Sequence, residues 1–323
     1  MDKPQWPEWA EKLKRTYLAG GASLFILHGN VADVMGSRSE AGYAVEPLAD
    51  FMARHLFGNY DLVLHYDMGR GLRPYSAGDP KRLTRMNSLL TKLLGNEEAL
   101  PRDPTQSLRT IDRLVSLLLV SEEGRALKTA VLFDYADFIC PPDDRAAEHL
   151  ATFLNWARSP VVRRVNLIFV LMAESLSRLH SSLVQSGHTE EVFLPLPNQT
   201  EREEFVRNQF PDCAAQAGQL AVMSAGLTLG NLDNMMRLLM LRKAPVAPMK
   251  AKESAEEGVV KTDAATAAAQ AETALQASAA AKGEQDAAFS AEYLTQIKKS
   301  LMEAQCPGLI EFIEPKFDLS AVA

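Results

Sequence analysis

Residues 130–140, AVLFDYADFIC, place one aspartate directly after an apolar run and a second three residues later. Short runs of this kind are typical of strands buried on both faces, as in parallel sheets. The run Ala130–Phe133 would put Asp134 at the carboxyl end of a central strand, where open α/β folds bind ligands. A carboxylate there can hold Mg²⁺, and Asp137 can position a water molecule for attack on a phosphate. The alternative role for both acids is to cap the loop before the next helix.

Four further apolar runs predict the rest of the sheet, and helical patterns separate them. Strands that alternate with such helices imply βαβ units. We therefore expect an α/β fold with a five-stranded, mainly parallel sheet between helices. The expected strands are Ser23–His28, Asp61–Tyr66, Ala130–Phe133, Asn166–Met172 and Val192–Leu194, and the expected helices are Glu8–Leu18, Val45–Phe57, Leu83–Leu94, Ser107–Val120 and Arg145–Arg158.

The strand signals stop at Pro197, so we predict an α/β domain over residues 1–197. Helical patterns then predict a small helical lid subdomain over residues 198–243. Its expected helices are Thr200–Asn208, Gln216–Ser224 and Leu229–Lys243.

Residues 244–288 differ in composition from the rest of the chain. Seventeen of these 45 residues are alanine and none is aromatic, so the segment cannot build a core. We predict a flexible linker there. A helix over Ala291–Gln305 and an extended apolar tail are expected in residues 289–323. Such a tail is typical of a chain that continues into a following module or packs on a partner.

The overall composition excludes several classes of protein. A net charge of −7 argues against general affinity for nucleic acid or for anionic membranes. The three cysteines form no CxxC pair, which argues against a disulfide framework or a zinc ligand set. The first ten residues do not resemble a signal peptide, and the longest apolar runs are far shorter than the ~20 residues of a membrane helix. We therefore expect a cytoplasmic protein.

The histidines give no support for zinc or nucleophilic catalysis. No HxxxH, HExxH or GxSxG pattern occurs in the chain. His28 and His65 fall on expected strands, and we expect them to be hydrogen-bonded histidines of the core.

A second set of candidate residues follows the strand Asn166–Met172. A polar residue at the tip of this strand could contact a γ-phosphate, which makes Glu174 a candidate; the alternative is that Ser175 simply caps a helix. Arg178 and Arg38 could each contact a phosphate, in cis or from a neighbouring subunit, or could be solvated surface arginines.

The sequence lacks a standard phosphate-binding loop. That loop has the form GxxxxGK[ST], with backbone N–H groups around the phosphates, and no GKS or GKT occurs in this chain. After the first expected strand, the two glycines are seven residues apart, and Asp33 between them would repel a phosphate. A divergent phosphate site would have to use Gly29, Asn30, Gly36, Ser37 and Arg38.

The order of these parts resembles an AAA+ ATPase module, which has a P-loop NTPase-like fold. Asp134–Asp137 lies where that family carries its Walker B acids, and Ala173–Ser175 follows the strand that ends in sensor 1. Leu194–Pro197 with Glu201-Arg202 resembles the step from the last strand to the lid, and Gly226–Leu229 resembles a turn of the lid.

The chain is similar, more narrowly, to the N-terminal half of bacterial proteins in which a degenerate module precedes a catalytic AAA+ module. Gly308–Leu319 resembles the junction before that second module. The resemblance implies a non-catalytic, pseudo-ATPase domain that serves assembly, regulation or partner docking within a larger ATP-hydrolysing machine. Its expected partners are a catalytic AAA+ module, in the same or another chain, and further copies in a homo-oligomer.

The alternative is a divergent nucleotide-binding NTPase that takes ATP or ADP with Mg²⁺. The family's roles would then fall on residues already named. Asp134 would hold the metal, Asp137 and Glu174 would complete the catalytic positions, and Arg178 would be the trans-acting arginine.

Overall fold

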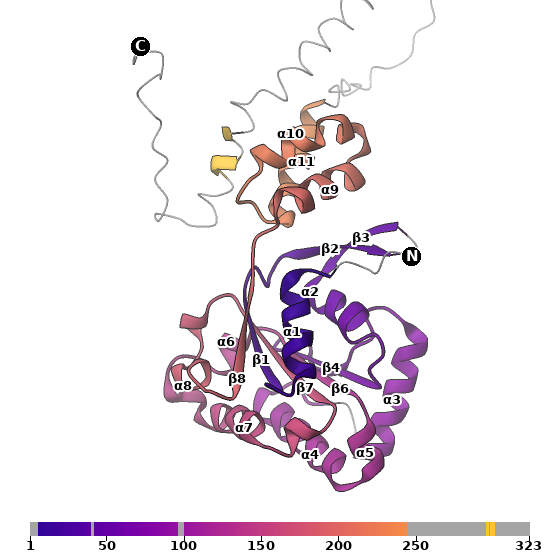
Figure 1. The fold of residues 1–323 in the computed structure, drawn as a ribbon, viewed down its shortest axis with the longest axis vertical. Helices are drawn as coiled ribbons and strands as arrows, with labels where there is room; N and C mark the ends of the chain where they lie inside the picture. Colours follow the sequence, from indigo (N-terminus) through magenta and orange to yellow (C-terminus); the bar gives the residue numbers. More distant parts are fainter. Residues whose placement is uncertain (1–5, 40–41, 96–99, 244–294, 297, 301–323) are drawn as a thin grey trace, which may run out of the picture. The chain divides into compact units, whose positions relative to one another are not determined.

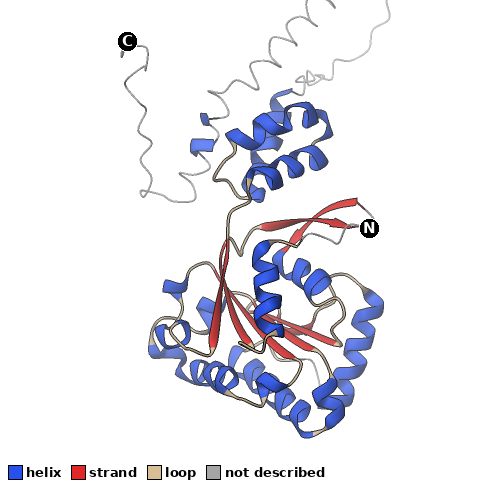
Figure 2. Cartoon of the chain, in the orientation of Figure 1, coloured by secondary structure: helices blue, strands red, loops and turns tan. Residues whose placement is uncertain are grey.

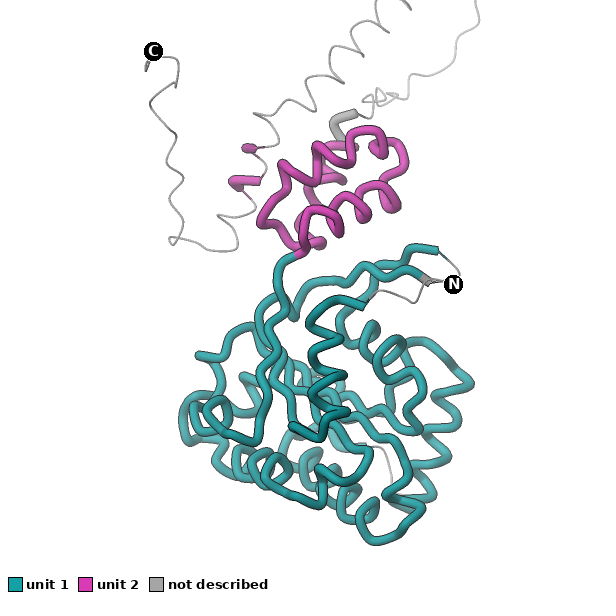
Figure 3. The backbone as a smooth tube through the Cα atoms, in the orientation of Figure 1, with its two compact units in different colours: residues 1–196 teal, residues 197–323 magenta. Residues whose placement is uncertain are grey.

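The computed structural model describes residues 6–39, 42–95, 100–243, 295–296 and 298–300. The chain divides into two units, Met1–Leu196 and Pro197–Ala323 (Figure 3). Each unit is described below by itself.

Unit 1 is built around a six-stranded sheet of order β5-β4-β6-β7-β1-β8 (Figures 1 and 2). Every residue of β6 and β7 is buried, as their continuous apolar sequences predict for central strands. All neighbouring strands pair in parallel except β4 and β5, which pair antiparallel. The strands are β1 (Leu24–Gly29), β4 (Leu62–Asp67), β5 (Gly71–Pro74), β6 (Thr129–Phe133), β7 (Leu167–Ala173) and β8 (Thr189–Leu194).

Helices flank this sheet and begin where the sequence offers caps (Figure 2). Asp79 and Asp103 each accept hydrogen bonds from backbone N–H groups of the following first turn, and a proline occupies the first helical position in both cases. On the sheet, the Trp156 ring stacks on Phe169 with centroids 4.6 Å apart. The helices of unit 1 are α1 (Glu8–Leu18), α2 (Leu48–Phe51) with a π-helix over Met52–Leu56, α3 (Pro80–Leu94), α4 (Pro104–Val120), α5 (Glu122–Ala126), α6 (Ala136–Ile139), α7 (Ala147–Arg158) and α8 (Ser181–Val184).

The sheet contains the five expected strands and one more. The extra strand, β5, follows a turn in which the Asp67 carboxylate accepts hydrogen bonds from the N–H groups of Gly69 and Arg70, at 2.9 and 2.7 Å. Gly71 then takes a φ of +78°, which glycine adopts without strain, and the chain reverses onto β4.

The prediction of a helix over Val45–Phe57 is wrong for its first residues. Val45 belongs to β3 (Gly42–Pro47), which pairs antiparallel with β2 (Val34–Ser39) in a separate hairpin. Helix α2 therefore begins only after Pro47. The N–H groups and carbonyls of Val45 and Glu46 are instead part of a β ladder that an apolar pattern alone did not reveal.

Unit 2 contains the three expected helices, α9 (Gln199–Gln209), α10 (Ala217–Met223) and α11 (Leu229–Lys243). A capping box starts α9, because the side chains of Asn198 and Glu201 each accept a hydrogen bond from the other residue's backbone N–H. Arg202 is buried and donates to the carbonyls of Ala221 and Pro197, so it ties α10 to the start of α9.

The expected linker over residues 244–288 lies outside the described residues, as does most of the segment 289–323. Within the expected helix Ala291–Gln305, residues 295–296 and 298–300 are described and are helical. No helix in the described part of the chain is long and apolar enough to cross a membrane.

Candidate functional site

Strands β6 and β7 bring the three predicted acids to one edge of the sheet. Asp134 follows β6 directly, and its backbone N–H donates to the carbonyl of Tyr66 on β4 at 2.9 Å. Asp137 lies in the first turn of α6, and Glu174 follows β7. Because β6 and β7 are parallel neighbours, their carboxyl ends meet at the same edge. The acids nevertheless enter two different clusters there.

Asp134 belongs to a hydrogen-bonded series of polar side chains that extends from the end of β6 across β4 to β5. Its Oδ2 lies 2.7 Å from Nε2 of His65, whose Nδ1 lies 2.8 Å from a guanidinium nitrogen of Arg73. A guanidinium only donates, so Nδ1 of His65 accepts and the ring hydrogen on Nε2 is donated to Asp134. Arg73 also pairs with Asp67 at 2.7 Å. The expected core role of His65 is therefore confirmed, with Asp134 as one of its two partners.

The Asp67 carboxylate ends this series of hydrogen-bonded side chains and pairs with Arg73. Burial alone would raise the pKa of Asp67, but hydrogen bonds from the Arg70 N–H and the Arg73 guanidinium, with the charge of Arg73, hold that pKa below its ordinary value. The His65 side chain is 4% exposed and that of Asp134 is 31% exposed. A cation that took Oδ2 of Asp134 would have to displace the ring hydrogen of a buried histidine.

Asp137 and Glu174 enter a second cluster, and Arg178 joins them. Nε of Arg178 lies 3.0 Å from Asp137 Oδ2, and Nη1 lies 2.6 Å from Glu174 Oε2. The Asp137 side chain is 6% exposed, whereas that of Glu174 is 61% exposed. The predicted trans-acting arginine is thus held in cis by two of the predicted acids. Loss of Arg178 would leave a buried carboxylate without its counter-ion.

The turn after β1 directs its N–H groups into the protein. Gly29 donates to the carbonyl of Glu174 at 3.2 Å, and Asn30 donates to the carbonyl of Leu194 at 3.0 Å. The Asn30 side chain bonds to Asp33 at 2.9 Å. Gly29 has a φ of +98°, and a Cβ there would meet the Leu194 carbonyl oxygen at 2.6 Å. A phosphate cradle needs N–H groups that point at the ligand, so these turn residues do not fit one.

The remaining predicted phosphate residues lie on β2. The Ser37 hydroxyl donates to Glu46 Oε1 at 2.9 Å, and both side chains are buried within the hairpin. Gly36 packs against Tyr43, whose Oη lies where a Cβ would be. Arg38 is opposite Tyr43 in the ladder and is exposed. Two basic side chains of the π-helix also contact Glu46, namely Arg54 and His55. The structure thus joins Ser37 to Glu46 rather than to Asp134.

The donor set at the sheet edge does not fit a magnesium site as it stands. No group of three or more His, Cys, Asp or Glu side chains in the described ranges could hold a metal ion. Asp134 accepts from His65, while Asp137 and Glu174 bind Arg178.

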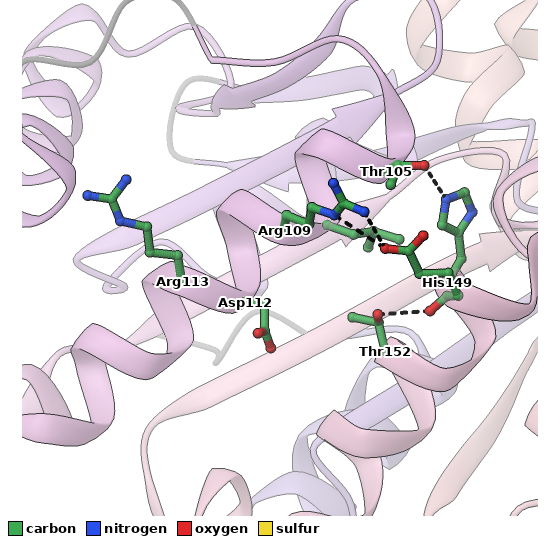
Figure 4. Close-up of a pocket in the computed structure, with 8 residues that line it drawn as sticks. Thr105, Arg109, Asp112, Arg113, His149 and Thr152 are labelled. Atoms are coloured by element: carbon green, nitrogen blue, oxygen red, sulfur yellow. Dashed lines mark hydrogen bonds and ion pairs between the residues drawn. The ribbon is translucent and has the colours of Figure 1, made fainter.

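A pocket of about 310 Å³ lies between α4 and α7, and none of the predicted site residues lines it (Figure 4). Thr105 donates to His149 Nε2 at 2.9 Å, and Nδ1 of the same ring donates to the Ile139 carbonyl at 2.8 Å. Arg109 and Glu148 form an exposed ion pair at 2.9 Å. Sequence reasoning missed this pocket because its two walls come from helices about 40 residues apart. Its polar groups hold the helices together and converge on no reactive atom.

Comparison with known proteins identifies the family. Residues 2–195 match the family model described as "AAA+ chaperone, N-terminal Rossmann-like domain". No curated protein sequence matches the chain. Among solved structures, a chain of the "Structure of E. coli MS115-1 HORMA:CdnC:Trip13 complex" is similar, with 11% identity and a TM-score of 0.43 over 74% of this chain and 76% of that chain. A likeness of this size supports no inference about partners or substrates.

Proposed function

Since the chain belongs to the AAA+ chaperone family, with residues 2–195 as its N-terminal Rossmann-like domain, we propose that it is a non-catalytic module of a larger ATP-hydrolysing machine. In this role it serves assembly, regulation or partner docking, and ATP is hydrolysed by another module.

The observation that carries this proposal is the pairing of Arg178 with Asp137 and Glu174. The resemblance implies catalytic positions for these two acids, and such positions require carboxylates that are free to reach a ligand. Both acids instead neutralise an arginine of the same chain. An ion pair with one buried carboxylate is costly to break, which favours a structural role for the cluster.

The turn after β1 supports the same proposal from a second direction. A phosphate-binding turn leads into a helix, so that its N–H groups and the helix dipole face the phosphate. Here Gly29 and Asn30 donate to neighbouring segments of the chain, and the hairpin of β2 and β3 follows in place of a helix. The chain therefore keeps the α/β sheet of the module but has a hairpin where a phosphate-binding turn and helix would follow the first strand.

We propose further that the module is the degenerate first half of a tandem arrangement. Its partner would be a catalytic AAA+ module, in the same or another chain, and the complete protein would form a homo-oligomer. Support comes from the family description and from the lost phosphate loop in the sequence.

The test is a calorimetric titration of the purified chain with Mg-ATP and with Mg-ADP, up to millimolar nucleotide. An Asp134→Ala variant and a Glu148→Ala variant are titrated in parallel, because Glu148 lines the pocket between α4 and α7, which none of the predicted acids lines. We expect no saturable heat from any of the three proteins. Micromolar binding that is lost in Asp134→Ala and kept in Glu148→Ala would overturn the proposal and establish a divergent NTPase instead.

A further inference from the structure

The turn between α7 and β7 carries a cluster of arginines. Residues 149–173 contain three arginines and no acidic residue, although the whole chain has 41 aspartates and glutamates. Arg158 is the last residue of α7, and Arg163 and Arg164 belong to the 3₁₀ helix Val162–Arg164. In the described part of the chain, none of these three arginines forms an ion pair. Nε of Arg163 is buried and has no hydrogen-bond partner among the described residues, so the positive charge of this turn is not compensated there.

Lys128 adds a fourth cation at the same edge of the sheet. It directly precedes β6, and the N–H of Thr129 donates to the carbonyl of Asn166, two residues after Arg164, at 2.8 Å. Because β6 and β7 are parallel neighbours, their amino ends meet at this edge, whereas the predicted acids follow their carboxyl ends. The four cations are therefore separate from the candidate site described above.

Three carboxylates belong to this edge and do not balance its cations. Asp61 Oδ2 accepts the backbone N–H of Lys128 at 2.9 Å, and the segment before Lys128 contains Glu122, Glu123 and Arg125. Five cations and three carboxylates leave an excess of two positive charges, whereas the chain as a whole has a net charge of −7. The edge is thus opposite in sign to the rest of the molecule and would attract an anionic partner.

An exposed valine lies among the arginines. Val161 is 49% exposed, and its carbonyl accepts the Arg164 N–H at 3.0 Å. The next residue, Val162, is 2% exposed and anchors the turn in the core, so the Val161 side chain is not needed for that purpose. Nucleic acids bind proteins chiefly through their phosphates, which gain nothing from an aliphatic side chain. A peptide that carries both carboxylates and aliphatic groups matches both parts of this surface.

We propose that Lys128, Arg158, Val161 and Arg164 form a docking surface, here called the amino-edge patch, for a partner protein segment that carries acidic residues next to aliphatic ones. The carboxylates of the partner pair with the exposed ammonium and guanidinium groups, and its aliphatic side chains pack on Val161. Charge selects this partner, because in the described ranges these cations have no ion-pair partner of their own. The inference rests on the proposed docking role and names the chemistry of the partner.

The test measures binding of a fluorescein-labelled hexapeptide of alternating glutamate and leucine to the full chain by anisotropy, at about 0.15 M salt, where long-range attraction is largely screened. The variant Arg158→Gln/Arg164→Gln removes two exposed cations of the patch. The matched control, Arg70→Gln/Lys92→Gln, removes two exposed cations outside the patch and changes the net charge equally. Urea unfolding of each variant first checks that it folds like the wild type.

The two parts of the patch should contribute separately to affinity. One exposed ion pair corresponds to a change in Kd of up to about fivefold. We therefore expect Arg158→Gln/Arg164→Gln to bind the peptide about tenfold more weakly and the control to bind like the wild type. Val161→Ser removes half-exposed aliphatic surface and should weaken binding about three- to fivefold.

Three results would overturn the proposal. Equal weakening in the two double variants would mean that the peptide responds to net charge alone. Unchanged affinity of Val161→Ser would contradict the aliphatic contact. A short single-stranded DNA that binds more tightly than the peptide, and less tightly to Arg158→Gln/Arg164→Gln, would assign the patch to nucleic acid.

A Mg-ATP titration of the same samples separates this inference from the function on which it rests. Nucleotide binding by the wild type would contradict the non-catalytic role, whatever the peptide does. A chain that binds neither nucleotide nor peptide would contradict only the partner chemistry proposed for the amino-edge patch.

Discussion

Replacement of Arg178 by alanine should destabilise unit 1 through the acid that it leaves behind. Asp137 has a 6% exposed side chain and pairs with Arg178 at 3.0 Å. Removal of one partner of a fully buried ion pair costs about 3–5 kcal/mol. Arg178 is itself 46% exposed, so solvent reaches one side of this pair. The expected loss is therefore nearer to that of a charged hydrogen bond, about 2 kcal/mol.

Glu174 supplies the matched control. It pairs with the same guanidinium at 2.6 Å, but its side chain is 61% exposed. Exposed pairs contribute about 0–1 kcal/mol, so Glu174→Gln should cost less than about 1 kcal/mol. The double variant Arg178→Ala/Asp137→Asn removes the stranded charge and should recover about half of the loss.

Urea unfolding followed by tryptophan fluorescence measures these free energies. All three tryptophans of the chain, Trp6, Trp9 and Trp156, lie in unit 1, so the signal reports on the unit that contains the ion pairs. The midpoint should shift without a change in slope. An Arg178→Ala variant within 0.5 kcal/mol (roughly, the usual size of a surface substitution) of the wild type would refute the reasoning. A Glu174→Gln variant as unstable as Arg178→Ala would do the same.

Three other predictions concern the same unit. Gly29→Ala should cost about 3 kcal/mol, because it adds a clash with a carbonyl to a φ of +98°, whereas Gly78→Ala, with a φ of +87° and open space around it, should cost about 1 kcal/mol in the same urea assay. The depressed pKa of Asp67 stabilises the fold at pH values above the ordinary carboxyl value of 3.8, and this effect is lost as the pH falls from 3.8 through the lower folded pKa. Wild type should therefore lose more stability than Asp67→Asn as the pH is lowered below 3.8, and an equal loss would contradict this. Burial raises the pKa of Cys140 to about 11, although a hydrogen bond from the His180 N–H opposes the shift, so iodoacetamide at neutral pH should label Cys140 in the unfolded chain and leave it unlabelled in the folded one, as site-resolved mass spectrometry would show.

The buried strands could be predicted because of where they lie in the sheet. A parallel strand with neighbours on both sides and helices on its faces has no polar position, so its sequence is apolar throughout. The runs that became β1, β6 and β7 have this character. β5 has only four residues and lies at the sheet edge, so its sequence carried no comparable signal.

The hairpin was missed for a different reason. Its buried positions include Ser37 and Glu46, polar residues that satisfy each other across the ladder. A pattern of apolar residues cannot reveal a strand whose inward side chains are polar. The glycine at position 42, with a φ of +118°, was the available turn signal.

The candidate site was predictable in its residues and not in its pairing. Asp134, Asp137 and Glu174 could be predicted to lie at one edge of the sheet, because each follows a parallel strand and the carboxyl ends of parallel strands meet at the same edge. Arg178 lies 41 residues after Asp137 in the chain, and sequence spacing does not tell which carboxylates a long side chain will reach. The same holds for His65, which meets Asp134 across 69 residues.

The strand order has a consequence for synthesis on the ribosome. Among the described strands of unit 1, β1 is made first, yet its two neighbours in the sheet are β7 and β8, which are made last. At ~5–20 residues per second, about 10–30 s separate the emergence of β1 from that of β8. During that interval the apolar strand β1 has no hydrogen-bonded neighbour on at least one edge, and unpaired strand edges favour aggregation. A nascent chain stalled before Thr189 should therefore depend on chaperones, while one released beyond Leu194 can close its own sheet.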